Sequence, residues 1–346
     1  MSMLHASQIN DRPHLSNMPS TGGIMRWVLI ATLPGLITMT FFFGLGVISN
    51  VVLAAAFGLG FEALILWLRK RPLRPALNDA SALLTGVLLG ASLPPASPWW
   101  LIGIGMVAAI IVAKQLYGGL GNNPFNPAMV GYALLLVSFP TYMTLWPTPQ
   151  PLWPDMLWGQ IMGNVSVDQI DSLSGATPLD AFKHKGEGVS ASQFWASQPL
   201  PSGTLNAWQW VSFAWLAGGV LLLAKRIITW HIPLTMLASM MAFASLLYLF
   251  DPEYFASPWL HLLTGATLFG AFFIATDPVS AATSQRGKLI YGAGIGALVM
   301  LIRTWGGYPD AIAFAVLLMN LCVPLLDLYT VPRPTGLKKT TSKEQP

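Results

Sequence analysis

The chain has 346 residues, of which 54% are hydrophobic and only 9% are charged; its formal net charge is +4 and its mean hydropathy is +0.58. Because an average soluble domain is about a quarter charged, this composition excludes a soluble protein and predicts an integral membrane protein. The single cysteine, Cys322, excludes a disulfide framework, a four-thiolate iron–sulfur cluster and a C-x-x-C-H haem attachment held by this chain alone.

Ten apolar segments along the chain predict membrane spans. A span needs about 20 largely apolar residues, and fewer where a helix is broken inside protein. The predicted spans lie at residues 25–44, 47–68, 80–93, 99–116, 127–140, 207–224, 232–250, 260–275, 289–303 and 309–328. The predicted fold class is an all-α integral membrane protein with about ten transmembrane helices, flanked by polar tails at 1–24 and 329–346. The first tail lacks the short apolar core and cleavage site of a signal peptide.

The two groups of five spans, at 25–140 and 207–328, share sequence features. LLTGVLLGASLPP in the first is similar to LLTGATLFGAFFIATDP in the second, and NPAMVGYALLL is similar to PDAIAFAVLLM. A repeat of five spans, an odd number, must be inverted, and transporter folds use this arrangement to form sites between the halves. We therefore expect two inverted five-span repeats with broken helices. Each match taken alone is also explained as a common membrane string.

Basic residues are distributed unevenly between the two sides of the predicted spans. All of the 18 lysines and arginines except Lys183, Lys185 and Arg303 fall on one side. Since cytoplasmic loops carry an excess of lysine and arginine, that side, with both termini, is predicted to be cytoplasmic. The long loop 141–206 between the halves is then expected to face the periplasm.

The outer loop contains the sequence DSLSGATPLD at residues 171–180. Its end, TPLD, is typical of a helix start, with Thr177 as N-cap and Pro178 at the first helical position. A phosphoester on the same hydroxyl is the functional interpretation, because Gly175 and Ala176 leave it sterically open and a helix N-terminus favours phosphate. The loop is expected to be exposed, with no deep pocket for a bound group.

Ionisable groups near membrane depth are functional by default. In this sequence they are Glu62, Lys114, Asp277, Arg303 and Asp327. Glu62 and Lys114 lie close to the predicted cytoplasmic boundary, so snorkelling also explains them. Tryptophans at outer span ends are typical of an interfacial belt. They are Trp99, Trp100, Trp208, Trp210 and Trp259.

Five stretches of the chain occur together in one family. They are NDASALLTG near residue 80, KQLYGGLGNNPFNPA near 120, SGATPLD in the outer loop, FGAFFIATDPVSA near 275 and IRTWGGYPDAIAFAVLLMN near 310. Together they resemble the D component of the Rnf ion-translocating oxidoreductase, a family related to the B component of the sodium-translocating NADH:quinone reductase. The resemblance covers about residues 20–330, and the short N-terminal extension favours the Rnf branch.

The resemblance implies that a flavin transferase attaches FMN through its phosphate to Thr177, the last residue of the motif formed by Ser174, Gly175, Ala176 and Thr177. A second T-G-A-T ends at Thr267. That copy lies inside the predicted eighth span, where a soluble transferase does not reach, and it lacks the following Pro-Leu-Asp. Thr177 is therefore the expected attachment site.

The resemblance also implies a non-covalent riboflavin within the membrane domain. Candidate ligands are polar residues in the predicted broken segments, namely Asn122, Asn123, Asn126, Thr276 and Asp277. Asp277 precedes a proline, where a helix would end in any case, so a capping role explains it nearly as well.

The predicted function is an FMN-bearing electron-transfer subunit of a redox-driven ion pump in the bacterial inner membrane. The resemblance implies a complex of six different proteins, in which the A, B, C, E and G components are the partners, and which couples electron flow between ferredoxin and NAD to ion movement. Lipid is expected around the spans, and no nucleic acid partner is expected. Two alternatives stay open: an inverted-repeat transporter or channel without flavin, and a structural anchor for the redox components. The sequence does not distinguish sodium from proton as the ion.

Overall fold

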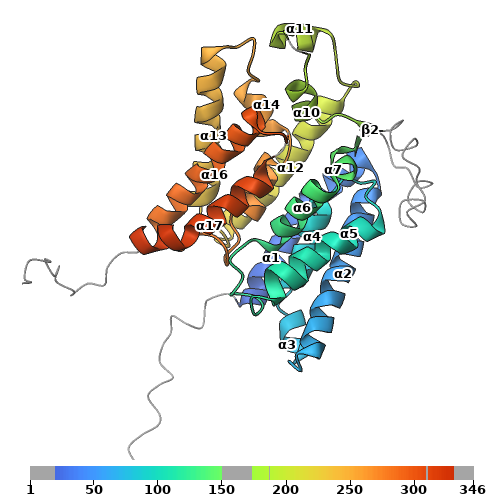
Figure 1. Cartoon of the computed structure of the whole chain (residues 1–346), viewed down its shortest axis with the longest axis vertical. Helices are drawn as coiled ribbons and strands as arrows, with labels where there is room; N and C mark the ends of the chain where they lie inside the picture. The colour runs from blue at the N-terminus through green and yellow to red at the C-terminus, as the bar shows by residue number, and fades with distance from the viewer. Residues whose placement is uncertain (1–19, 150–173, 187, 309–310, 331–346) are drawn as a thin grey trace, which may run out of the picture.

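The computed structural model describes residues 20–149, 174–186, 188–308 and 311–330, and these are mostly helical (Figure 1). Most of the two predicted tails, and residues 150–173 of the predicted outer loop, lie outside the described residues. In Figure 1 the helices of the first half (blue to green) lie beside those of the second half (yellow to red), and two short helices of the outer loop, α10 and α11, lie at one end.

The first half contains the helices that precede the outer loop. They are α1 (Thr21–Phe43), α2 (Gly46–Leu68), α3 (Leu73–Leu77), α4 (Ser81–Ser92), α5 (Trp99–Met106), the π-helix η1 (Val107–Gln115), α6 (Pro127–Ser138) and α7 (Pro140–Thr144). η1 directly continues α5. The start of α6 follows its sequence: the Asn126 side chain accepts a hydrogen bond from the N–H of Met129, and Pro127 occupies the first position, where its missing N–H costs nothing.

The outer loop and the second half follow. The loop contains the strand pair β1 (Trp146–Pro147) and β2 (Ser174–Gly175) and the short helices α10 (Pro178–Lys183) and α11 (Ala191–Ala196). The second half contains α12 (Thr204–Ala224), α13 (His231–Phe250), α14 (Pro258–Leu263), α15 (Thr267–Phe269), the π-helix η2 (Gly270–Ile274), α16 (Gln285–Trp305) and α17 (Ile312–Thr330).

Each of the ten predicted spans overlaps helical residues. Within the described part of the chain, six helices are long and apolar enough to cross a membrane, namely α1, α2, α12, α13, α16 and α17. Three predicted spans correspond to shorter apolar helices, which are α4, α5 with η1, and α6. The predicted span 260–275 is divided among α14, α15 and η2. Membrane crossing by these four segments stays a prediction.

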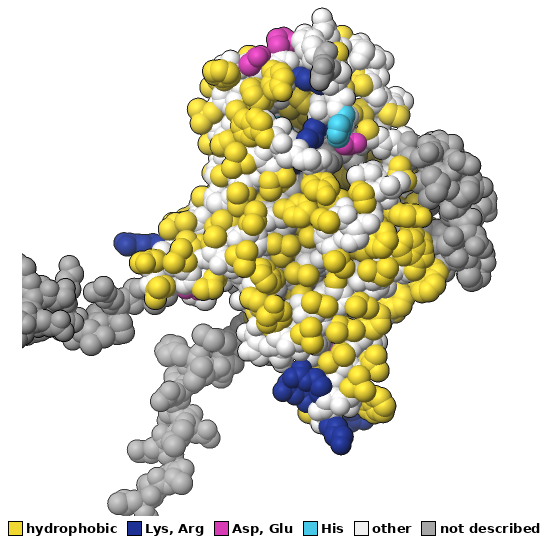
Figure 2. Space-filling view, viewed as in Figure 1, with side chains coloured by type: hydrophobic (Ala, Val, Ile, Leu, Met, Phe, Trp, Pro, Cys, Tyr) yellow, Lys and Arg dark blue, Asp and Glu magenta, His cyan; other side chains and the backbone are white. Residues whose placement is uncertain are grey.

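The surface of the helices is suited to lipid. Figure 2 shows hydrophobic side chains over the middle of one face, with basic side chains at the end that carries α3 and a mixture of acidic, basic and histidine side chains at the opposite end. Large apolar side chains on the long helices are exposed, including Phe41 at 68% and Leu249 at 78%. Because soluble monomers rarely expose apolar patches of this extent, this surface and the six long apolar helices indicate a multi-pass membrane protein.

The halves meet where α1 packs against α12 and where α6 packs against α17. Lipid tails are as apolar as leucine, so membrane helices associate through close packing and hydrogen bonds. Gly218 of α12 permits such packing, because a Cβ there would overlap the carbonyl oxygen of Ala31 in α1. Gly60 of α2, in contrast, faces open space.

The variant Gly218→Val should prevent stable packing of α1 against α12, since the added atoms collide with backbone. Thermal unfolding in mild detergent, followed by fluorescence-detected size exclusion, should show aggregation or a clearly lower Tm. Gly60→Ala is the matched control and should be neutral or stabilising by up to about 1 kcal/mol, because alanine has the higher helix propensity. Equal stability of the two variants would contradict the close approach.

Candidate functional site

The motif SGAT is held at one end of the interface between the halves. β2 pairs antiparallel with β1, so that Gly175 lies opposite Trp146. α10 begins directly after Thr177, whose Oγ1 accepts a hydrogen bond of 3.3 Å from the N–H of Asp180. Pro178 occupies the first helical position. The predicted helix start at Thr177 is confirmed.

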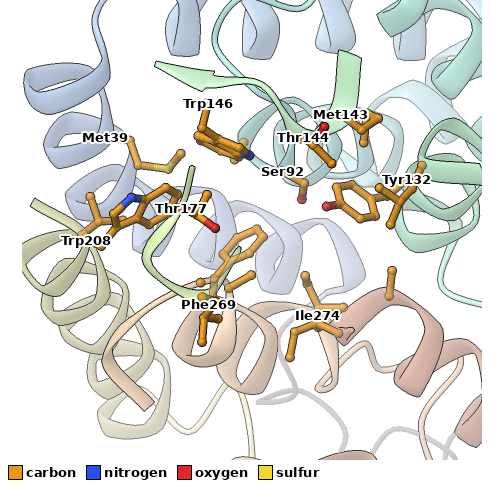
Figure 3. Close-up of a pocket in the computed structure, with 18 of the residues that line it drawn as sticks. Met39, Ser92, Tyr132, Met143, Thr144, Trp146, Thr177, Trp208, Phe269 and Ile274 are labelled. Carbon is orange, nitrogen blue, oxygen red and sulfur yellow. The ribbon is translucent and has the colours of Figure 1, made fainter. Parts of the chain in front are cut away.

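Thr177 lines a cavity between the two halves, which we call the Thr177 cavity. Its other lining residues include Met39, Ser92, Tyr132, Met143, Thr144 and Trp146 from the first half and Trp208, Trp215, Phe269, Ile274 and Ile312 from the second. Figure 3 shows the hydroxyl oxygen of Thr177 directed into this space, toward the ring of Phe269. The side chain that the sequence singles out therefore faces the interior of the protein.

The walls of the Thr177 cavity are largely aromatic. The rings of Trp146 and Trp208 meet edge to face with centroids 5.1 Å apart, and the rings of Trp215 and Phe269 lie 4.4 Å apart. The assignment of Trp208 to an interfacial belt is wrong, because this side chain is only 7% exposed. Trp210, two positions further along α12, is 62% exposed and agrees with that assignment.

The expectation of an exposed loop without a pocket is also wrong at Thr177. This residue is half-buried, and Pro178 and Leu179 after it are buried. The pairing of β2 with β1 and the packing of α10 fold the motif back onto the interface. Ser174 pairs through its backbone, and Ala176 remains exposed. Sequence reasoning missed the pocket because strand pairs of two residues leave no periodic pattern.

The second T-G-A-T, which falls within the predicted eighth span, lies at a break between two helices of that segment. Thr264, Gly265 and Ala266 separate α14 from α15, and Gly265 has a left-handed backbone with φ 67°. Thr267 is fully buried, and its hydroxyl donates to the carbonyl oxygen of His261 at 2.7 Å. Although Gly265 and Ala266 line the Thr177 cavity, the Thr267 hydroxyl is engaged with backbone.

A second cavity lies nearer the opposite end of the interface, and we call it the Asn126 cavity. Its lining includes Asn123, Asn126, Thr276 and Asp277 together with Ser81, Lys114 and Phe273. Four of the five polar residues predicted for a second cofactor are thus brought together from the two halves. The fifth, Asn122, is exposed and stands apart from this lining.

Hydrogen bonds fix most of these polar groups. Asn126 donates through Nδ2 to the carbonyl oxygen of Ile274 at 3.2 Å, and Asp277 accepts from Ser280 Oγ at 2.6 Å. Asn123 donates through Nδ2 to a backbone carbonyl. Its Oδ1 is buried and has no hydrogen-bond partner within the described part of the chain. An acceptor is therefore available in the Asn126 cavity.

A buried amide that sequence reasoning missed ties the two halves together beside this cavity. Asn320 of α17 accepts from the backbone N–H of Asn126 at 3.1 Å. Its Nδ2 donates to the Tyr291 hydroxyl at 2.8 Å and to the carbonyl oxygen of Ser280 at 3.0 Å. The sequence signal that could have revealed Asn320 is an amide side chain inside an otherwise apolar span. Polar side chains at such positions commonly form hydrogen bonds between membrane helices.

Glu62 and Lys114 form a buried ion pair instead of snorkelling. Lys114 Nζ lies 2.6 Å from Glu62 Oε1 and donates to Ser81 Oγ at 2.7 Å, and Gln115 donates to the same carboxylate oxygen at 2.8 Å. Both charged side chains are 2% exposed. Glu62 Oε2 has no hydrogen-bond partner among the described residues. The described residues contain no group of three or more histidine, cysteine or acidic side chains that could hold a metal ion.

Comparison with known proteins identifies the family. The model of the NQR2, RnfD, RnfE family matches residues 8–336. The chain belongs to this family. Relatives named as the D component of an ion-translocating oxidoreductase complex share 48% identity over 350 residues in Vibrio vulnificus, 50% over 343 residues in Vibrio cholerae and 49% over 351 residues in Escherichia fergusonii. These matches cover 95%, 95% and 96% of this chain and 99% of each relative. The family resemblance drawn from the sequence motifs is confirmed.

In this member of the NQR2, RnfD, RnfE family, Lys114→Met should destabilise the fold by about 3–5 kcal/mol, because it leaves the buried Glu62 carboxylate without its counter-charge. The expected readout is a large drop in Tm in detergent. The double variant Glu62→Gln/Lys114→Met should recover much of the loss, since no buried charge remains. Lys70→Met, at an exposed position, is the control. If the single and double variants unfold at the same temperature, the pair does not carry the stability assigned to it.

Proposed function

We propose that this protein is an electron-transfer subunit of a redox-driven ion-translocating oxidoreductase complex and that it carries FMN on Thr177. The full-length similarity to relatives named as the D component of such a complex supports the assembly. The observation that carries the flavin assignment is the Thr177 hydroxyl directed into an aromatic cavity (Figure 3). Partners would be the A, B, C, E and G components of a complex of six proteins, with electrons passing between ferredoxin and NAD.

The residues of the Thr177 cavity fit an isoalloxazine ring. Aromatic and methionine side chains pack well against a flat conjugated ring, and Tyr132, Ser92 and Thr144 place hydroxyl groups in the lining. In the attachment reaction, Thr177 Oγ1 bonds to the FMN phosphorus of a flavin adenine dinucleotide donor. The phosphoanhydride bond breaks, AMP leaves, and the hydroxyl proton passes to a base of the flavin transferase. The bound flavin supplies the redox chemistry.

We assign a non-covalent riboflavin to the Asn126 cavity. If Thr177 faces the periplasm, an electron from the cytosol must cross a hydrocarbon core of about 30 Å to reach it. A second carrier is therefore required between the cytosolic face and Thr177. One cysteine cannot hold an iron–sulfur cluster within this chain. The unpartnered Asn123 Oδ1 and the polar residues Asn126, Thr276 and Asp277 suit the hydrogen-bonding edge of a flavin.

The proposed topology has ten spans in two inverted repeats, with both termini in the cytoplasm of a bacterial cell and the flavin loop in the periplasm. Packing of α1 against α12 and of α6 against α17 supports it, because each pair joins corresponding helices of the two repeats. Lys114 precedes Gly118-Gly119 in the first half, and Arg303 precedes Gly306-Gly307 in the second half. Each contacts the start of the corresponding broken segment, at Ser81 and His261 respectively.

An inverted-repeat transporter without flavin is the second candidate. The observation in its favour is a pair of cavities between the halves, separated where Asn126 donates to the carbonyl oxygen of Ile274. A permeation path between the halves that is closed at one point would also consist of two cavities separated by that closure. Covalent flavin separates the two candidates, because a transporter of this kind needs none.

The attachment assignment is tested by in-gel fluorescence. The full chain produced together with the transferase should give a fluorescent band after denaturation in SDS, because only a covalent flavin survives this treatment. Thr177→Ala should abolish the band, and Thr267→Ala should keep it. Thr177→Ser should retain part of the label, since the hydroxyl is preserved. Loss of the band in Thr267→Ala with retention in Thr177→Ala would overturn the assignment.

The second flavin is tested with the Thr177→Ala protein. After purification in mild detergent and acid precipitation, the supernatant should contain about one riboflavin per chain, consistent with one non-covalent site. Asn123→Leu should lower this ratio because it removes the unpartnered acceptor, whereas Asn122→Leu, at the exposed neighbouring position, should leave it unchanged. A folded protein that releases no flavin would show that the inner carrier belongs to another component of the complex.

A further inference from the structure

The helix that follows the flavin threonine is too short to be stable alone. α10 has six residues, whereas isolated helices shorter than about 12–15 residues are marginal in water. Its position, and with it the direction of the Thr177 hydroxyl, must therefore be set by contacts with the rest of the protein.

Two lysines tie α10 to the second half. Lys183 Nζ donates to the carbonyl oxygens of Tyr308 at 2.8 Å and of Ile302, in the last turn of α16, at 3.3 Å. Lys185 Nζ donates to the carbonyl oxygens of Tyr254 at 2.7 Å and of Glu253 at 3.3 Å. Burial lowers the pKa of both ammonium groups, partly offset by Asp180 near Lys183. The sequence distinguishes these two lysines only as two of the three basic residues on the predicted periplasmic side.

A small apolar cluster completes the contact. Leu179 and Phe182 of α10 pack with Phe194 of α11 and with Ala256 and Leu260 of the second half. Lys185 also lies over the Phe182 ring, 4.4 Å from its centroid. The cluster is separate from the main core of the helices. α10 can therefore detach without opening the interface between the halves.

In the attached position Thr177 is a poor substrate for a soluble enzyme. The hydroxyl faces the cavity, and its oxygen already accepts the hydrogen bond from the N–H of Asp180. A transferase must place both its base and the phosphorus of a flavin dinucleotide next to this oxygen. On that side the hydroxyl is enclosed by the cavity, whose walls include Trp208 and Phe269.

We propose that α10 must detach from the second half before Thr177 receives its flavin, and that Lys183 and Lys185 act as the latch that afterwards holds the flavin in the Thr177 cavity. This inference rests on the proposed function and adds an order of events to it. FMN is attached to Thr177 first, and α10 docks on the second half afterwards. The lysines are positioning residues and do not take part in the transfer itself.

The test uses the full chain in mild detergent with Lys183→Cys, Tyr308→Cys and Cys322→Ser. A reducible bis-methanethiosulfonate bridge between the two cysteines replaces the contact between Lys183 and Tyr308. Incubation with purified transferase and flavin adenine dinucleotide should label the reduced protein and leave the bridged protein essentially unlabelled. Protein treated with methyl methanethiosulfonate, which blocks both thiols without joining them, should label like the reduced form.

Equal labelling rates for the bridged and reduced forms would overturn the inference, because the transferase would then reach the docked threonine. Absence of label from the reduced form would refute covalent attachment itself, and the order of events with it. Protein that is labelled first and bridged afterwards should show weaker quenching of its flavin fluorescence by iodide. Unchanged quenching would also count against the latch.

Lysine variants give a second, independent measurement. Lys183→Met/Lys185→Met should label several-fold faster than the unmodified sequence, since the apolar replacements keep the side-chain volume and lose the four carbonyl contacts. Its flavin should be more accessible to iodide. Lys70→Met is the matched control and should change neither property. Slower labelling of the double variant would overturn the latch, because the docked helix would then be the form that the transferase recognises.

Discussion

Backbone groups in the broken helices need hydrogen-bond partners in a region from which water is excluded, and this requirement organises the whole interface. At the break between α14 and α15, Thr267 and Arg303 both donate to the carbonyl oxygen of His261. At the end of η2, Asn126 donates to the carbonyl oxygen of Ile274. In the second case the partner comes from the other half. The hydrogen bond that satisfies the Ile274 carbonyl at this break therefore also joins the two halves.

The same breaks create the two cavities. A helix that stops at the interface leaves space that its neighbours do not fill, and side chains from both halves line that space. The wall between the cavities is thin: Met129 and Ile274 line the Thr177 cavity, whereas the adjacent Ala128 and Phe273 line the Asn126 cavity. Two carriers placed in these cavities would therefore lie on either side of a wall formed in part by adjacent residues of α6 and η2.

Stability is distributed unevenly over this architecture. The buried pair of Glu62 and Lys114 sits deep between α2 and η1, where an unpaired charge would be costly. The helices of the outer loop, in contrast, are short and are held by a small cluster around Phe182 and by the two lysine contacts. Segments of this kind have a low free energy of local unfolding. The proposed attachment site at Thr177 is therefore located where local opening costs least.

Local patterns along the chain are enough to establish the class of protein, the positions of the helices and the cap at Thr177, because hydropathy and capping act over a few neighbouring residues. The family resemblance, together with the polar residues of the broken segments, suggests Asn122, Asn123, Asn126, Thr276 and Asp277 as one group, and the fold brings all of these except Asn122 to one cavity. The direction of the Thr177 side chain, the burial of Trp208 and the contacts of Lys183 are set by the folded arrangement alone. These features depend on pairings between residues far apart in the chain, for which hydropathy carries no signal.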